Sequence, residues 1–319
     1  MASIIKKLIN GILSDVIQLE HSAQDIDDSI TKTSQLTGRN LLDNWYFADP
    51  VNQRGQTSYT GAVYGVDRWR ILAGNTISVE TSGLRITGSN DTSFSSMIQQ
   101  KFPEELLNAL DGKTVTASIL VSENTGGGAV AARLGSFPGS AVTTGLSTYT
   151  VTFNKSSHSY FSIQCATHKT ANFVVQAVKL ELGTQQTLAR KAVDGTWVLI
   201  DPPPNKAEEL AKCQRYCLVI APNNSYAPSG NGMVQTTASA RIIIPTPVPL
   251  RVNPSILYTG AWQLLANGWS QPVDGMSVAG SSSVAVQIDA AASGLVVGQG
   301  VVMRTNNDST AKIILSADL

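Results

Sequence analysis

The chain has 319 residues, enough for two or three domains, and its 23 basic and 23 acidic side chains cancel to a net charge of zero. This balance argues against nucleic acid as the main partner, because binding to phosphates requires an excess of basic residues. Charged residues make up only 14% of the chain, against about 25% in soluble domains, and no run of eighteen apolar residues predicts membrane insertion.

The N-terminal stretch from Ile5 to Thr33 carries apolar residues with a period of seven. Two such series form a heptad seam of about four repeats, which predicts an α-helical coiled coil within residues 1–38. Because isoleucine at the core positions favours three or more strands over two, we expect a homotrimer. The seam consists of Ile5, Ile9, Ile12, Val16, Leu19, Ala23, Ile26 and Ile30.

Two observations bear on what this segment contacts. An amphipathic helix that packs on the protein's own globular domain would show the same stripe, so self-association is a hypothesis. The first turns also carry apolar residues off the seam, which a trimer would leave in water. They predict that residues 1–20 dock into another protein, and they are Ile4, Leu8, Leu13 and Ile17.

From Leu41 on, short runs of alternating apolar residues lie between Gly, Asn, Ser and Pro, as in a β-sandwich or barrel. We place this domain at residues 39–183, with one helix expected over 101–110. A hairpin is predicted over 76–87, with its turn at Gly83. The clearest predicted strands are 114–121, 147–153, 160–165 and 173–182.

A connector follows at residues 184–217. Its helix is predicted over 206–217 with Asn205 as the N-cap. Cys213 and Cys217 would then lie one turn apart, but no histidine lies near enough in the sequence to complete a metal site. Residues 218–319 are predicted to be all β. Prolines at 245, 247, 249 and 254 place the strand that contains them at a sheet edge or at a corner.

No residue pattern predicts catalysis. The three histidines, His21, His158 and His168, form no metal-binding or catalytic motif. A glycan hydrolase would need a pair of carboxylates, for which Asp43, Asp49 and Asp67 are the candidates, but nothing in the sequence brings two of them together. We therefore predict no catalytic residue, no metal and no cofactor.

Aromatic residues are the candidate ligand-binding groups, because their faces stack on sugar rings. Most buried aromatics belong to a core, and we assign Trp45 and Trp69 to that role. The remaining candidates for glycan binding are Tyr46, Tyr59, Tyr64, Trp262 and Trp269.

Several segments resemble a known group of proteins. Asn40-Leu-Leu-Asp-Asn-Trp-Tyr-Phe, Pro50-Val-Asn-Gln-Arg-Gly and Tyr64-Gly-Val-Asp-Arg-Trp resemble the opening of a jelly-roll domain, similar to a carbohydrate-binding module, in phage and prophage tail and fibre proteins. Lys179-Leu-Glu-Leu-Gly resembles the close of that domain, and residues 207–216 resemble the helix that follows it. Residues 244–255 resemble a proline-rich strand of fibre tip domains, although Leu250 stands where that pattern has Met.

The resemblance implies a mainly β protein: an N-terminal coiled coil and two β-sandwich, jelly-roll-like domains in a trimeric fibre. It implies a structural component on the capsid or tail surface of the virion. The expected partners are two further copies of the chain, another virion protein at residues 1–20, and a host surface glycan or receptor. It supplies no catalytic residue. The alternatives are a purely structural head fibre or connector protein without a ligand, and a glycan-degrading enzyme.

Overall fold

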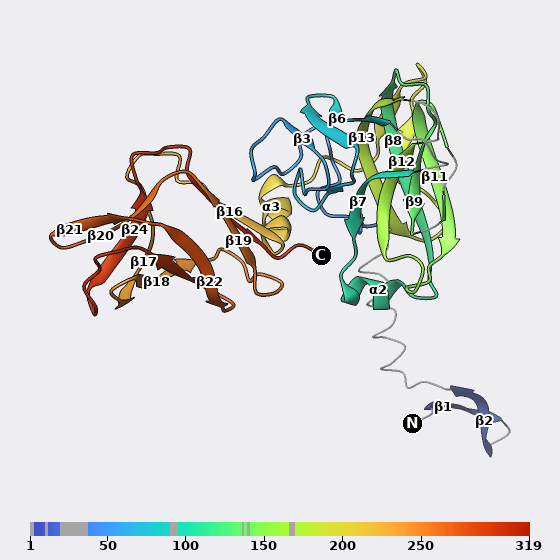
Figure 1. Ribbon diagram of the computed structural model, residues 1–319. Coiled ribbons are helices and arrows are strands. Elements are labelled where there is room, and N and C mark those ends of the chain that lie inside the picture. Colours follow the sequence, from blue (N-terminus) through green and yellow to red (C-terminus); the bar gives the residue numbers. More distant parts are fainter. Residues whose placement is uncertain are drawn as a thin grey trace.

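Antiparallel β-sheets dominate the computed structural model, which describes residues 3–9, 12–19, 38–89, 95–135, 137–138, 141–165 and 170–319 (Figure 1). Within these residues two short helices interrupt the strands, Glu104–Leu110 (α2) and Lys206–Gln214 (α3). The prediction of a mainly β fold is therefore confirmed.

Two sheets face each other across one core in the first β domain, as in a β-sandwich. In the described part of the chain their strand orders are β11-β8-β13-β6-β5-β3 and β10-β9-β12-β7-β4. The strands are β3 Ser58–Thr60, β4 Arg70–Ile71, β5 Asn75–Glu80, β6 Gly83–Ser89, β7 Ser95–Lys101, β8 Thr114–Asn124, β9 Val130–Leu134, β10 Phe137–Pro138, β11 Gly145–Thr152, β12 Tyr160–Cys165 and β13 Thr170–Leu182.

Trp69 lies in the core between these sheets. Its ring makes edge-on contacts with Phe47 and Phe161, with centroids 5.1 and 6.0 Å away. Its indole Nε1 donates a hydrogen bond to the Asn44 carbonyl at 3.0 Å, so the one polar atom of the ring is satisfied. Trp69 and Trp45 are both buried, which confirms their assignment to the core.

The end of the chain forms two further sheets around a second core. Among the described residues their strand orders are β16-β25-β19 and β21-β20-β24-β17-β18-β23-β22. The strands are β16 Cys217–Ile220, β17 Pro228–Thr236, β18 Ser239–Pro245, β19 Ser255–Thr259, β20 Trp262–Ala266, β21 Trp269–Pro272, β22 Gly275–Ser281, β23 Ala285–Ala291, β24 Gly300–Thr305 and β25 Lys312–Ser316.

The proline-rich segment turns a corner between these two sheets. β18 pairs with β17 on one side and β23 on the other, so it is an internal strand, and Pro245 is its last residue. The chain then crosses to β19 in the other sheet. Of the two predicted placements, the corner is the one observed, because prolines cannot supply donors to an internal ladder.

The connector contains the predicted helix, but the helix ends earlier than predicted. Asn205 caps α3, with its side-chain oxygen accepting a hydrogen bond from the Ala207 N–H at 3.0 Å. The helix ends at Gln214, so Cys217 begins β16 and does not share the helix with Cys213. Before α3, strands β14 Ala189–Lys191 and β15 Trp197–Leu199 form a small hairpin.

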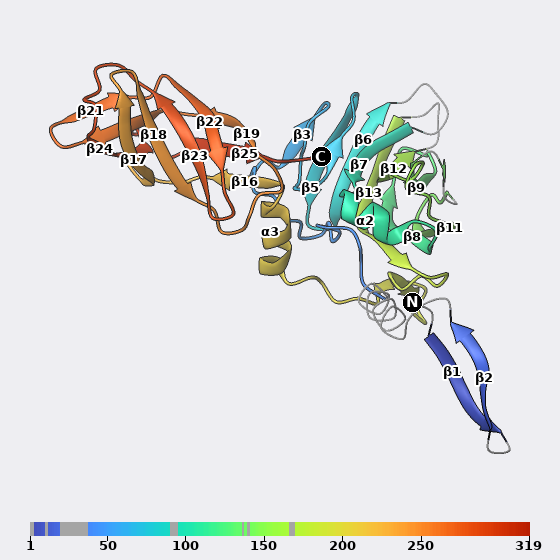
Figure 2. The same ribbon diagram turned by 90° about the horizontal axis from the view of Figure 1, so that it is seen from below.

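The N-terminal helix prediction is wrong over residues 3–9 and 12–19. The structure has an antiparallel hairpin there, of Ser3–Ile9 (β1) and Ile12–Leu19 (β2), which lies apart from both β domains in Figures 1 and 2. Isoleucine and valine favour strands, and the sequence between the strands is Asn-Gly, a strong hairpin signal. The seam positions in this hairpin are Ile5, Ile9, Ile12, Val16 and Leu19, whereas Ala23, Ile26 and Ile30 lie outside the described residues.

A buried lysine fixes the connector against the first domain. Lys179 on β13 is fully buried, and its Nζ donates to the Gly38 carbonyl at 3.1 Å and to Thr187 Oγ1 at 2.6 Å. It also pairs with the Asp201 carboxylate, and Glu181 Oε2 lies 3.6 Å away. These partners offset the cost of removing the ammonium from water.

We expect Lys179→Met to lower the free energy of unfolding by about 3–5 kcal/mol, because it leaves the buried Glu181 without its cation. Urea denaturation measures this change. Lys191→Met is the matched control, since Lys191 is exposed on β14, and we expect an effect within about 0.5 kcal/mol. Equal effects of the two substitutions would contradict the structural role of Lys179.

Candidate ligand-binding cleft between the two domains

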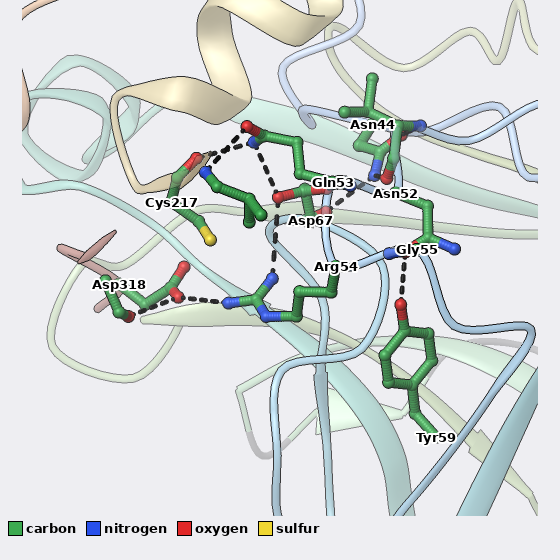
Figure 3. Close-up of polar contacts among 12 residues, drawn as sticks. Asn44, Asn52, Gln53, Arg54, Gly55, Tyr59, Asp67, Cys217 and Asp318 are labelled. Carbon is green, nitrogen blue, oxygen red and sulfur yellow. Dashed lines mark hydrogen bonds and ion pairs between the residues drawn. The ribbon is translucent and has the colours of Figure 1, made fainter. Parts of the chain in front are cut away.

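The loop at residues 51–57 of the first β domain makes hydrogen bonds to the second β domain (Figure 3). Gln53 donates hydrogen bonds to both Asp67 carboxylate oxygens, from its backbone N at 2.7 Å and from its Nε2 at 3.0 Å. The same Nε2 donates to the Cys217 carbonyl at 2.7 Å, at the start of β16. One glutamine side chain therefore connects a buried carboxylate of the first domain to the backbone of the second.

Arg54 makes the second connection. Its Nη2 donates to Asp318 Oδ2 at 3.1 Å, and its Nη1 lies 3.6 Å from Asp67 Oδ1. Lys312 on β25 donates from Nζ to the Arg54 carbonyl at 3.2 Å. A single guanidinium therefore lies between a carboxylate of each domain, and all three side chains are largely buried.

Burial changes the proton affinity of these carboxyl groups. Loss of hydration raises the pKa of Asp67 to about 6, although the bonds from Gln53 and the charge of Arg54 act in the opposite direction. Burial also raises the pKa of Asp318. We call the contact of Gln53, Arg54 and Asp67 with Cys217 and Asp318 the joint. Its Asp67 carboxylate takes up a proton in mildly acidic solution.

A cavity of about 650 Å³ opens beside this joint, and we call it the interdomain cleft. Its first wall comes from the loop and strand region of the first domain: Arg54, Gln56, Tyr59, Val63 and Tyr64. Tyr64 is fixed in this wall because its hydroxyl donates to the Leu319 carbonyl at 2.6 Å.

The second wall is one face of the β19–β25 ladder. Alternate residues of a strand share a face, so one face lines the cleft and the other packs into the second core. The core-facing residues include Ile256, Tyr258, Ile313 and Leu315. The cleft-facing residues are paired across the ladder as Ser255 with Ser316, Leu257 with Ile314, and Thr259 with Lys312.

The lining combines apolar surface, hydroxyl groups and positive charge. Leu257 is 62% exposed and Val63 44% exposed, so both walls present apolar surface to the cleft. Among the described lining residues the charged groups are Arg54 and Lys312, and none is an acid. The cleft is therefore suited to bind a ligand with both apolar and hydroxyl-bearing faces.

The structure brings together two of the five predicted glycan-binding residues. Tyr59 and Tyr64 both line the cleft, but Tyr59 is only 5% exposed and its hydroxyl donates to Asn52, so little of its ring is accessible for stacking. Tyr64 is half-buried.

The other three candidates lie elsewhere. Tyr46 packs against the first core and forms an edge contact with Trp45, with centroids 5.9 Å apart. Trp262 is 2% exposed in the second core, so its ring faces are not accessible for stacking and this prediction is wrong. Trp269 is half-buried at the start of β21, with its Nε1 donating to Gln299 Oε1 at 2.5 Å.

Sequence reasoning missed the residues of the second wall. Leu257, Ile314 and Lys312 carry no motif, and only their alternation with buried neighbours distinguishes them. That alternation predicts an outward face but not what lies opposite to it. The sequence does not indicate the role of Arg54 in joining the domains, because that role depends on Asp318, 264 residues away.

The candidate carboxylates for hydrolysis are each engaged separately. Asp43 pairs with Arg68 at 3.0 Å, Asp49 pairs with Lys206, and Asp67 lies in the joint. No group of three His, Cys, Asp or Glu residues in the described part of the chain is arranged to hold a metal ion, and His21 and His168 lie outside it. Nor does that part contain a helix that is long and apolar enough to span a membrane.

Comparisons with known proteins add no identification. No protein-family model matches the sequence, and no curated protein is similar enough to count as a relative.

The pKa of Asp67 gives the protein a specific pH dependence. Between about pH 4 and pH 6 the folded protein holds a proton on Asp67 that the unfolded chain has already lost. The free energy of unfolding therefore falls as the pH rises through this window, by up to ~3 kcal/mol from this group.

Asp67→Asn removes the titrating group, so we expect a flatter pH dependence of stability between pH 4 and pH 6. Urea denaturation at pH 4, 5, 6 and 7 measures the slope. The exposed Asp49 supplies the control substitution Asp49→Asn, which should retain the wild-type slope. An unchanged slope in Asp67→Asn would show that this carboxyl does not titrate in the window.

Proposed function

We propose that the protein is a trimeric fibre component of a phage virion and that it binds a host surface glycan in the interdomain cleft. The observation that carries this proposal is the composition of the cleft, in which exposed aliphatic side chains and Tyr64 alternate with hydroxyl groups. Sugars present the same combination, because their rings have apolar C–H faces and hydroxyl edges. The resemblance of the first domain to fibre modules supports the assignment to a virion.

Both walls supply groups that can recognise a sugar. Leu257 and Tyr64 supply surface for an apolar ring face. Thr259 and Ser255 supply hydroxyls that both donate and accept hydrogen bonds. Lys312 and Arg54 favour acidic or hydroxyl-rich sugars, and the lack of a lining acid among the described residues supports binding over hydrolysis.

A trimer would compensate for the weakness of a single shallow site. Three identical clefts on one fibre raise the effective affinity for a repetitive surface without any new contact. The seam positions that remain for the proposed trimer are Ala23, Ile26 and Ile30, which lie outside the described residues. The hairpin itself is the proposed docking element for another virion protein, because an isolated two-stranded hairpin is marginally stable in water.

We expect Leu257→Glu to weaken glycan binding at least about tenfold, because it puts a charge in the centre of the cleft wall. The measurement is glycan-array binding, followed by calorimetry with the best sugar. Ile243→Glu is the matched control, since Ile243 is 49% exposed on β18 and does not line the cleft. Unchanged binding by Leu257→Glu would show that the glycan binds outside the cleft. A wild-type protein that binds no glycan would favour a purely structural fibre protein.

We expect sedimentation equilibrium of the full chain to give a molecular mass three times the 33.8 kDa of one chain. The double substitution Ile26→Asp and Ile30→Asp introduces charges into the seam and should give monomers. The control pair Ser22→Asp and Gln24→Asp adds the same charge off the seam and should stay trimeric. A folded wild-type monomer would contradict the trimer, and a trimeric seam variant would place its assembly in the β domains.

A further inference from the structure

A second cavity, of about 210 Å³, lies where α3 meets the first domain. Four cationic side chains line it, and Asp43 is the one acid among its described lining residues. We call it the arginine pocket, and its cations are Arg39, Arg68, Lys212 and Arg215.

Arg68 forms the buried part of this pocket. It is 2% exposed, its Nε donates to Asp43 Oδ2 at 3.0 Å, and its Nη2 donates to the Lys101 carbonyl at 3.0 Å. The guanidinium carbon lies 3.5 Å from the centroid of the Tyr216 ring, which holds the group in place. Its Nη1 is buried and has no hydrogen-bond partner among the described residues.

An unpartnered nitrogen on a buried guanidinium is costly, because the charged group has lost its water without gaining an acceptor. The neighbouring acids do not supply that acceptor. Asp43 is bonded to Arg68 through Nε, and Glu209 pairs with Lys212. No carboxylate in the described part of the chain pairs with Arg39 or Arg215, both of which are exposed.

We propose that the arginine pocket binds a phosphate group. A phosphate has several acceptor oxygens, and the planar fork of arginine bonds two of them at once. An oxygen held against Arg68 would give Nη1 its missing acceptor, while Arg39 and Arg215 would neutralise the remaining charge. This site is separate from the interdomain cleft, since the two cavities share no lining residue.

The same chemistry could come from a free phosphate ion or from a phosphate ester carried by a surface polymer. Titration calorimetry of the full-length protein with inorganic phosphate, glycerol 3-phosphate and glycerol, at constant ionic strength, distinguishes these sources. We expect saturable binding of a phosphate compound with a Kd on the order of 1 mM or tighter, and no binding of glycerol. Tighter binding of the ester would identify an esterified ligand, and tighter binding of the ion would identify free phosphate.

Substitutions at the mouth of the pocket test its location. The double variant Arg39→Gln and Arg215→Gln should weaken phosphate binding at least about tenfold, because it removes two charges from the oxyanion. The variant Arg190→Gln and Lys191→Gln removes the same charge from exposed positions on β14 and should bind as the wild type does. Arg68→Lys keeps the charge but lacks Nη1, the nitrogen left for the phosphate, so it should bind more weakly than the wild type.

Two results would overturn the proposal. One is a wild-type protein that shows no saturable binding of either phosphate compound. The other is a pair of double variants with equal affinity, which would reduce the binding to general electrostatic attraction. Glycan binding in the cleft is tested with Leu257→Glu, at a residue that does not line the arginine pocket, so either site can fail without the other.

Discussion

The buried carboxylate of Asp67 is the interaction on which the arrangement of the two β domains depends. It is fully buried, and burial of a charge is costly unless it is bonded and paired. Gln53 and Arg54 offset part of that cost, and they also place donors against Cys217 and Asp318 of the second domain. The hydrogen bonds of this side chain therefore help to set the relative position of the cleft walls, together with the bonds from Tyr64 to Leu319 and from Lys312 to Arg54.

The hydrogen-bond network around Asp67 continues to α3. Asn44 Nδ2 donates to the carbonyls of Val51 and Asp67, at 2.9 and 2.8 Å, and Asn44 Oδ1 accepts from the Val51 N–H at 2.7 Å. The Asn44 N–H in turn donates to Glu209 Oε2 on α3 at 2.7 Å. Since Glu209 pairs with Lys212 of the arginine pocket, the two cavities lie at opposite ends of one buried polar network. Such networks specify a unique geometry because any broken member leaves another unsatisfied.

Features that depend on residues close together in the sequence could be predicted, whereas contacts between distant residues could not. The strand 160–165 was predicted at the bounds observed for β12, because a period of two is a local signal. The cap of α3 by Asn205 is also local. At the N-terminus two local signals competed. The heptad spacing predicts a helix, whereas the β-branched residues and the Asn-Gly at positions 10 and 11 favour a hairpin, and residues 3–9 and 12–19 form strands.

The cleft itself was beyond local reasoning, because its walls come from parts of the chain that are far apart. Tyr64 bonds to a residue 255 positions later, and neither partner carries a pattern that indicates the other. The contacts between these distant segments also matter for binding, because they hold the two walls in place. A ligand that touches both walls would lose affinity if the domains moved independently, because binding would then have to order them. The bonds from Gln53 and Arg54 order the walls in advance, so three clefts on one fibre would contribute to avidity without repeating that cost.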